Sequence, residues 1–291
     1  MTPASFDYFS PASIEEALAL LREHGDEAKI LAGGQSLIPL MKLRFTSFPY
    51  IIDISRVAGL KFVREGEGKL SIGAMTTSAE LENSELVAKN CSILHDACSQ
   101  IADPLVRNMG TIGGNLSHGD PGNDLPAVMI ALKAKFQLVS SKGRREVDAS
   151  LFYKDTFVTD ASQDEILVQV DIPEHGREYA GAYVKHKRRA GDFSVAGVAV
   201  AFEKGKDGRL RNVGVGLTSL GPTAIHAAKT ESLLEGKVPD GPTIGKAIET
   251  AKQEASPVTD FYGTADYKLL ALGILMERAI RSALSRTAGG K

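Results

Sequence analysis

The fold of this chain is decided by the segment Ala32-Gly33-Gly34-Gln35-Ser36-Leu37 and by its counterpart about eighty residues later, Thr111-Ile112-Gly113-Gly114-Asn115. Each segment follows an apolar stretch and places paired glycines beside a hydroxyl residue. Because glycine has no Cβ, the backbone N–H groups at such a place are open to a phosphate. Together the two segments predict a cradle for a dinucleotide.

The composition is that of a globular protein with no general affinity for polyanions. The chain has 291 residues, of which 43% are hydrophobic, and this favours a buried core in two or three domains. Its 34 basic and 36 acidic residues give a net charge of −2, so nothing favours binding to nucleic acid or an anionic membrane. Neither an export pattern nor a run of apolar residues long enough for a membrane span is found, so we expect a cytoplasmic protein without membrane insertion.

Cysteine and histidine are too sparse to predict a metal site. Cys91 and Cys98 are seven residues apart in a helical pattern, which predicts two buried thiols on one helix face. The six histidines are scattered along the sequence. Iron–sulfur clusters need about four thiolates each, and structural zinc needs closely spaced Cys or His ligands. We therefore expect no metal on this polypeptide.

Hydrophobic periodicity predicts the elements of the first half. A helix is expected over 13–24, with Ser13 and Glu16 as a capping box and Gly25 as its end. Strands at 29–31 and 50–54 flank a helical stretch at 37–43, which makes a small β-α-β unit. We further expect a strand at 69–74, helices at 77–81 and 84–101, and strands at 135–140, 145–147 and 165–172, the last alternating Ile166, Val168, Val170 and Ile172. The second glycine segment is expected to continue as a loop to Pro126.

The second half has a different order of elements. Strands are expected at 180–186, 194–203 and 211–219, and helices follow at 222–235, 242–255 and 264–285. Strands followed by helices predict an α+β layer. We therefore divide the chain at residues 57 and 177 into the parts 1–57, 58–177 and 178–287, with a tail at 288–291 that should fray. The two glycine segments fall in the first and second parts.

The standard nucleotide fingerprints G-x-G-x-x-G and G-x-x-x-x-G-K-[ST] are missing, and an isolated Gly-Gly pair is more often a tight turn than a binding loop. Hydroxyls at Ser36 and Thr111 and the amide of Asn115 make binding more plausible, because they supply donors for a phosphate or a sugar. Two aspartates leave alternatives open. Asp120 either accepts from ribose hydroxyls or forms an Asx turn, and Asp124 either does the same or caps a helix that starts near Leu125.

These segments resemble a known family. The stretch 32–44, the segment 111–115 and its extension 119–124 look like the FAD-binding medium subunit of molybdenum hydroxylases, the family of xanthine dehydrogenase, and most like that of aerobic carbon monoxide dehydrogenases. The resemblance covers essentially the whole chain. It implies an α+β protein with a two-subdomain FAD-binding fold of the vanillyl-alcohol-oxidase (PCMH) type over 1–57 and 58–177. A C-terminal α+β domain with a three-stranded antiparallel sheet and helices would follow at 178–287.

The resemblance also implies the residues that would bind FAD. They are Ala32, Gly33, Gly34, Gln35, Ser36, Leu37, Ala102, Thr111, Gly114, Asn115, Asp124, Leu167, Lys185 and Phe193. This sequence departs from the family pattern at two of them. Many relatives carry His in place of Gln35, and Tyr is common where Phe193 stands. Neither change removes a phosphate donor, but Phe193 would leave the flavin face apolar.

By the same resemblance, no catalytic residue is expected on this chain, because the chemistry would belong to cofactors. Electrons would come from two [2Fe-2S] clusters on a small partner subunit, fed by a molybdenum cofactor on a large partner subunit. They would leave for a quinone, NAD or oxygen. The assembly implied is a dimer of heterotrimers. Lys185 is hypothesised to lie near the flavin and favour its reduced, anionic form, because a cation stabilises developing negative charge.

Other readings of the sequence stay open. A stand-alone FAD-dependent oxidoreductase of the same fold would need its own substrate pocket, and a reductase for a nucleotide-sugar enol ether would need residues that handle NADPH. A non-redox nucleotide-binding module would purify without colour. The basic run Lys185-His186-Lys187-Arg188-Arg189 is either a solvated strand end or a surface for a partner or an anionic acceptor. The substrate of the complex cannot be named from this chain.

Overall fold

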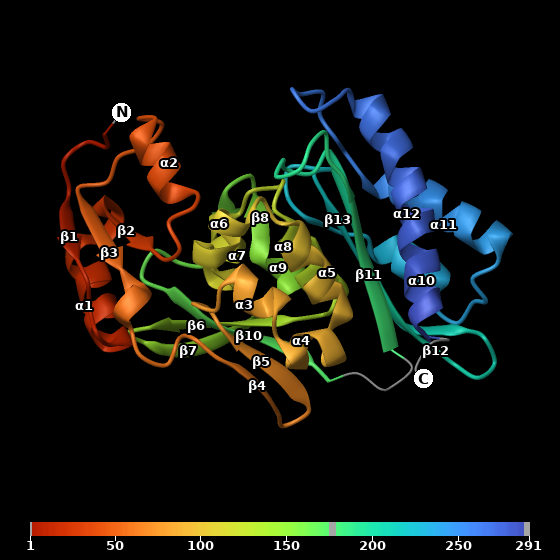
Figure 1. Cartoon of the computed structure of the whole chain (residues 1–291), viewed down its shortest axis with the longest axis horizontal. Coiled ribbons are helices and arrows are strands. Elements are labelled where there is room, and N and C mark those ends of the chain that lie inside the picture. Colours follow the sequence, from red (N-terminus) through yellow and green to blue (C-terminus); the bar gives the residue numbers. More distant parts are fainter. Residues whose placement is uncertain (1, 175–178, 288–291) are drawn as a thin grey trace.

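The computed structural model describes residues 2–174 and 179–287. The expected boundary at residue 177 and the expected tail at 288–291 lie outside the described residues. The described part is α+β and contains three larger sheets that succeed one another along the chain (Figure 1).

The first sheet is parallel and small. It has the order β1-β3-β2 and is formed by β1 (Asp7–Phe9), β2 (Ala28–Leu31) and β3 (Tyr50–Asp53), with α1 (Ile14–His24), α2 (Leu37–Lys42) and 3₁₀ turns at Gly25–Glu27 and Ile54–Arg56. The β-α-β unit predicted from the sequence is present, and β1 is an additional strand. Ser13 caps α1 as expected, but the Glu16 carboxylate accepts from the N–H of Ala12, so the capping box is incomplete.

The second sheet is antiparallel, with the order β4-β5-β10-β6-β7. Its strands are β4 (Val63–Gly66), β5 (Lys69–Gly73), β6 (Lys135–Ser140), β7 (Gly143–Asp148) and β10 (Ile166–Pro173). Around it lie α3 (Ser78–Glu82), α4 (Glu85–Asn90), α5 (Ser92–Gln100), α6 (Pro104–Met109), α7 (Ile112–His118), α8 (Asp124–Ala131) and α9 (Ala149–Phe152), and the hairpin of β8 (Tyr153–Asp155) and β9 (Val158–Thr159).

A β-bulge in β10 interrupts the regular alternation that was predicted for this strand. Between Leu167 and Gln169 the register against β6 shifts by one residue. Ile166 and Val168 therefore pack into the core of the first sheet, whereas Val170 and Ile172 pack into the core of the second. One strand thus contributes to two hydrophobic cores and joins the first two parts of the molecule.

The prediction of one continuous helix over 84–101 was wrong, because the helical conformation is interrupted at Cys91, between α4 and α5. Asn90, a weak helix former, ends α4, and Cys91 takes a non-helical conformation. Cys91 and Cys98 are both buried and free, as predicted, but they do not share one continuous helix. The loop predicted after Thr111 was also partly wrong, because its first seven residues form α7.

The third sheet is antiparallel and has four strands, one more than predicted, in the order β11-β12-β13-β14. These are β11 (Tyr179–His186), β12 (Ala196–Lys204), β13 (Leu210–Thr218) and the short β14 (Ile225–His226). Because β14 occupies residues predicted to be helical, α10 (Ala228–Leu234) begins at 228 instead of 222. With α11 (Gly241–Glu254) and α12 (Ala265–Thr287), α10 covers one face of this sheet, and α5 and α8 cover the other (Figure 1).

All eight residues of α8 are buried between the second and third sheets. Gly214 and Gly216 of β13 let the helix approach the strand, since a Cβ on either would lie 1.9 or 2.0 Å from the carbonyl oxygens of Ala131 and Ala127. Two strand residues and one helical turn have similar lengths, so the contacts repeat. The packing fixes where the N-terminus of α8 lies, and this matters for the site.

Candidate functional site: a glycine-lined cofactor cradle

The two glycine segments lie against each other. A Cβ on Gly33 would be 2.1 Å from the carbonyl oxygen of Met109, just before the second segment. A Cβ on Gly114 would be 3.5 Å from the side chain of Ala32. Only glycine at position 33 permits this approach, so the absence of side chains there brings the segments together.

The first segment leaves its backbone donors unused. In the described part of the chain, the N–H groups from Gly33 to Leu37 donate to no other group. Gly34 has φ +71°, which turns the backbone, and Ser36 precedes α2 without capping it by a side-chain hydrogen bond. Beside the segment is an open hollow of about 450 Å³ lined by Gly34, Gln35, Ile38, Pro39, Lys42 and Leu43. Unpaired donors beside a hollow suit an anionic ligand.

The second segment begins a helix instead of forming a loop. Thr111 caps α7, and its Oγ1 accepts from the N–H of Gly114 at 3.1 Å. The N–H of Gly113 donates to the carbonyl of Ala74, and a Cβ on Gly113 would lie 2.6 Å from the Ala74 side chain. Two of the expected phosphate donors are therefore used inside the protein. A further polar atom of the segment, Oδ1 of Asn115, is buried and has no partner in the described residues.

These features fit the diphosphate of FAD. A diphosphate needs several N–H or O–H donors at a surface without side-chain bulk, and the first segment offers both. The orphaned oxygen of Asn115 can accept a hydrogen bond from a hydroxyl of the ligand.

Asp124, the first residue of α8, lies in a buried polar cluster. The Lys185 ammonium donates to its Oδ2 at 2.7 Å, and the Tyr183 hydroxyl donates to its Oδ1 at 2.5 Å. Only 1% of the Lys185 side chain is exposed. Burial raises the pKa of the Asp124 carboxyl, and the adjacent Lys185 opposes this rise. Lys185 is thus not a surface residue, and Asp124 does not cap α8, which begins after Asn123.

Strand register explains how Asp124 meets Lys185. In the third sheet, Lys185 pairs with Gly197, and Gly197 pairs with Thr218. The glycine contacts with β13 direct the N-terminus of α8 toward this row. The amide of Asn123 donates to the carbonyl of Asn115 at 2.8 Å, so the cluster is also tied to the second glycine segment.

The three other residues expected at the site, Ala102, Phe193 and Leu167, differ in their surroundings and in how far they are buried. Ala102 has a positive φ of 39°, uncommon for alanine, and lies beside Gly191 of the β11–β12 connection. Phe193 is 46% exposed, and a Cβ on Gly122 would lie 3.2 Å from its ring. Leu167 is buried in the core of the second sheet, at the β10 bulge. The structure therefore places 32–37 against 111–115 and pairs Asp124 with Lys185, whereas Ala102, Leu167 and Phe193 lie in other surroundings.

Tyr183 and Asn123 also belong to the site, but neither was predicted from the sequence. Tyr183 lies two residues before Lys185 on one strand, so period two places both side chains on the same face, and this signal was available. Asn123 carried no comparable signal. Asp120 forms the Asx turn, since its Oδ1 accepts from the N–H of Gly122. In the basic run, Arg188 lies over the Phe261 ring and donates to the Phe261 carbonyl.

No group of three or more His, Cys, Asp or Glu side chains in the described residues is placed to hold a metal ion. Within the same residues, none of the helices combines the length and the apolar character that crossing a membrane requires.

Comparison with known proteins adds to this geometry. Residues 4–175 match the model of the FAD binding domain in molybdopterin dehydrogenase, and residues 181–283 match that of the CO dehydrogenase flavoprotein C-terminal domain. The carbon monoxide dehydrogenase medium chain of Hydrogenophaga pseudoflava is 40% identical over 288 residues, which cover 99% of this chain and 100% of that one.

Solved structures agree over the same length. The structure of carbon monoxide dehydrogenase from Hydrogenophaga pseudoflava, in a form lacking the Mo-pyranopterin moiety, contains a chain with a TM-score of 0.96 and 41% identity, covering 98% of this chain and 99% of that one. Quinoline 2-oxidoreductase from Pseudomonas putida 86 contains a chain with a TM-score of 0.92 and 32% identity, with 99% of each chain covered.

Proposed function

Because the chain belongs to the family of FAD-binding medium subunits of molybdenum hydroxylases, we propose that it binds FAD between its two glycine segments and passes electrons through a three-subunit complex. The chain is an oxidoreductase subunit, and substrate oxidation takes place on a partner. The observation that carries the FAD site is the contact of Gly33 with the Met109 carbonyl, with unpaired N–H groups alongside.

The proposed FAD site is built from all three parts of the chain, which we place at 1–57, 58–177 and 178–287. The N–H groups from Gly33 to Leu37 bind the diphosphate, with the Ser36 and Thr111 hydroxyls as further donors. Ala32 and Gly114 line the contact between the segments, and Asn115 accepts from a ligand hydroxyl. Of the remaining proposed contacts, Gln35, Ala102, Leu167 and Phe193 shape the walls.

Asp124 and Lys185 supply the charged part of the site. An ammonium has three N–H donors, and Asp124 uses one of those on Lys185. No other described group accepts from Lys185, so two of its N–H groups are unpaired, and we propose that they donate to FAD when it binds. FAD, when bound, supplies the redox chemistry that no side chain here can provide.

The partners proposed are a small subunit with two [2Fe-2S] clusters, which donates electrons, and a large subunit with the molybdenum cofactor. A dimer of such heterotrimers is the assembly we propose, and a quinone, NAD or oxygen is the final acceptor. Support comes from the relatives, which match over nearly their whole length and are named as a dehydrogenase medium chain, a dehydrogenase and an oxidoreductase. Carbon monoxide and quinoline appear in their names, so relatives with different substrates share this chain's fold.

Purification of the tagged chain from its native host tests the proposal. We expect a yellow complex that contains a larger and a smaller polypeptide, molybdenum and iron. A yellow chain that purifies alone and oxidises a substrate by itself would instead identify a stand-alone oxidoreductase. A colourless chain that takes up no FAD would identify a non-redox module. The tagged chain expressed without its neighbouring subunits serves as the control for metal carried by the tag.

A further inference from the structure

Tyr183 is a buried residue whose hydroxyl holds the charged pair of the proposed site. It donates to Oδ1 of Asp124, while Lys185 donates to Oδ2 of the same carboxylate. With one donor on each oxygen, the carboxylate cannot rotate without breaking a hydrogen bond. Tyr183 therefore fixes the orientation of Asp124, and through it the position of the Lys185 ammonium.

Because the cluster is buried, Asp124 depends on the Tyr183 hydroxyl as a hydrogen-bond donor. Tyr183 and Asp124 are 3% and 5% exposed. Burial raises the pKa of the Tyr183 hydroxyl well above its ordinary value, and the neighbouring Asp124 carboxylate raises it further. The hydroxyl therefore stays protonated and acts as a donor at any physiological pH. A buried carboxylate oxygen that lost this donor would be left unsatisfied, which is costly.

The backbone around Tyr183 is shaped to admit the hydroxyl. A Cβ on Gly197 would lie 2.6 Å from the hydroxyl oxygen and 3.2 Å from the ring carbon that carries it. Gly197 is also the strand partner of Lys185. An alanine at this position would retain the hydroxyl but displace it from Asp124.

We propose that Tyr183 is a positioning residue for Lys185, which it acts on through Asp124, and that this chain of hydrogen bonds sets the redox potential of the bound flavin. The inference rests on the proposed FAD site. A cation held next to the flavin favours the reduced form, because that form carries more negative charge. If Lys185 is less firmly held, this preference weakens and the potential falls.

The test is a double-mutant cycle in the full-length chain loaded with FAD, with the flavin midpoint potential as the readout. Tyr183→Phe should weaken the preference for reduced over oxidised flavin about tenfold, a fall of about 30 mV for two electrons. Lys185→Met should lower the potential at least as much. Because Tyr183 acts through Lys185, adding Tyr183→Phe to Lys185→Met should cause no further shift.

Two further variants complete the experiment. Tyr153→Phe is the matched control, since the Tyr153 hydroxyl is buried without a hydrogen-bond partner in the described residues, and it should leave the potential unchanged. Gly197→Ala should shift the potential in the same direction as Tyr183→Phe, and it replaces that variant if the latter does not fold. If a variant loses its FAD, the Kd for FAD replaces the midpoint potential as the quantity compared across the cycle.

Additive effects of Tyr183→Phe and Lys185→Met would overturn the inference, as would a potential for Tyr183→Phe equal to that of Tyr153→Phe. Failure of the wild-type chain to bind FAD would overturn the proposed function itself, so the two failures can be told apart.

Discussion

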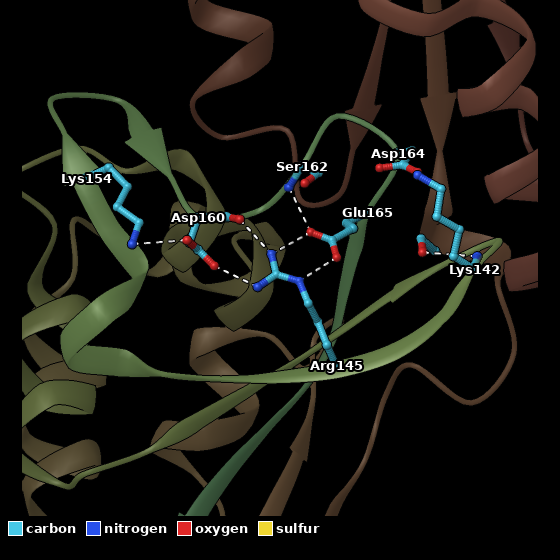
Figure 2. A network of polar contacts seen from close by, with 8 residues as sticks. Lys142, Arg145, Lys154, Asp160, Ser162, Asp164 and Glu165 are labelled. Carbon is cyan, nitrogen blue, oxygen red and sulfur yellow. Dashed lines mark hydrogen bonds and ion pairs between the residues drawn. The ribbon is translucent and has the colours of Figure 1, made fainter.

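Arg145 on β7 binds two carboxylates with one guanidinium group (Figure 2). Its Nε and Nη2 donate to the two oxygens of Glu165 at 2.6 and 2.7 Å, and its Nη1 donates to Asp160 at 2.7 Å. Lys154 approaches Asp160 from the other side at 3.0 Å. This network holds the segment with the β8–β9 hairpin, where the N–H of Phe157 donates to the carbonyl of Gly119 next to the proposed site.

Because of this network, the free energy of unfolding should decrease as the pH falls into the acid range. Hydrogen bonds from Arg145 lower the pKa values of Asp160 and Glu165. Carboxyls with lowered pKa values stabilise the folded state above their unfolded values, about 3.9 and 4.3, and lose this effect as the pH falls through the folded values. Arg145→Met should cost about 1 kcal/mol at pH 7, given the partial exposure of the network, which is about 3 °C in Tm.

Thermal unfolding from neutral pH to about pH 3 checks this prediction, with the range set by the unfolded values above. The difference in Tm between wild type and Arg145→Met should shrink as the pH falls below those values. Arg144→Met is the control, because in the described part of the chain the Arg144 side chain makes no hydrogen bond or ion pair, and the residue is held only by its backbone pairing with Val139. An equal difference at both ends of the pH range would contradict the account.

Among the elements, α8 carries the geometry of the site, because its packing on two glycines of β13 places Asp124 beside Lys185. The two glycines of β13 are needed for this packing, whereas a glycine with open space around it lowers stability. Gly245 lies within α11, and a Cβ there would meet no atom within 4 Å. Such a glycine only adds flexibility to the unfolded chain and weakens the helix.

The same substitution should therefore have opposite effects at the two places. Gly245→Ala should stabilise the protein by about 0.5–1 kcal/mol, because alanine is the better helix former. Gly216→Ala should destabilise it by about 3 kcal/mol, because its Cβ would overlap the Ala127 carbonyl oxygen. Chemical denaturation of both variants measures the free energies of unfolding. A stabilised Gly216→Ala, or a destabilised Gly245→Ala, would show that the packing is not as described.

Periodic elements could be predicted from the sequence, whereas elements set by contacts between distant segments could not. The strands around Tyr50 and Val198 have clear apolar runs, and the long helix near Leu275 has a clear amphipathic pattern. The helix at Gly113 was missed because paired glycines have poor helix propensity, and only their packing on Ala74 explains why they are there. The β10 bulge likewise depends on two cores that meet at one strand.

Across the whole molecule, the proposed site draws on all three parts of the chain. The first part brings Gly33, the second brings Thr111 and Asp124, and the third brings Lys185. The glycine segments could be found in the sequence because short side chains beside hydroxyl residues are a local signal. The bond from Tyr183 to Asp124 could not, because it depends on how α8 packs against the third sheet.

The central claim is that the two glycine segments together hold FAD, and the FAD content of three purified full-length proteins tests it most directly. Wild type should bind one FAD per chain, and so should Gly66→Ala, since a Cβ on Gly66 meets nothing within 4 Å. Gly33→Ala should bind FAD at least about tenfold more weakly, a loss of about 1.4 kcal/mol, because its Cβ would push against the Met109 carbonyl and separate the segments. Equal FAD affinity in Gly33→Ala and Gly66→Ala, or a wild-type protein that takes up no FAD, would contradict the claim.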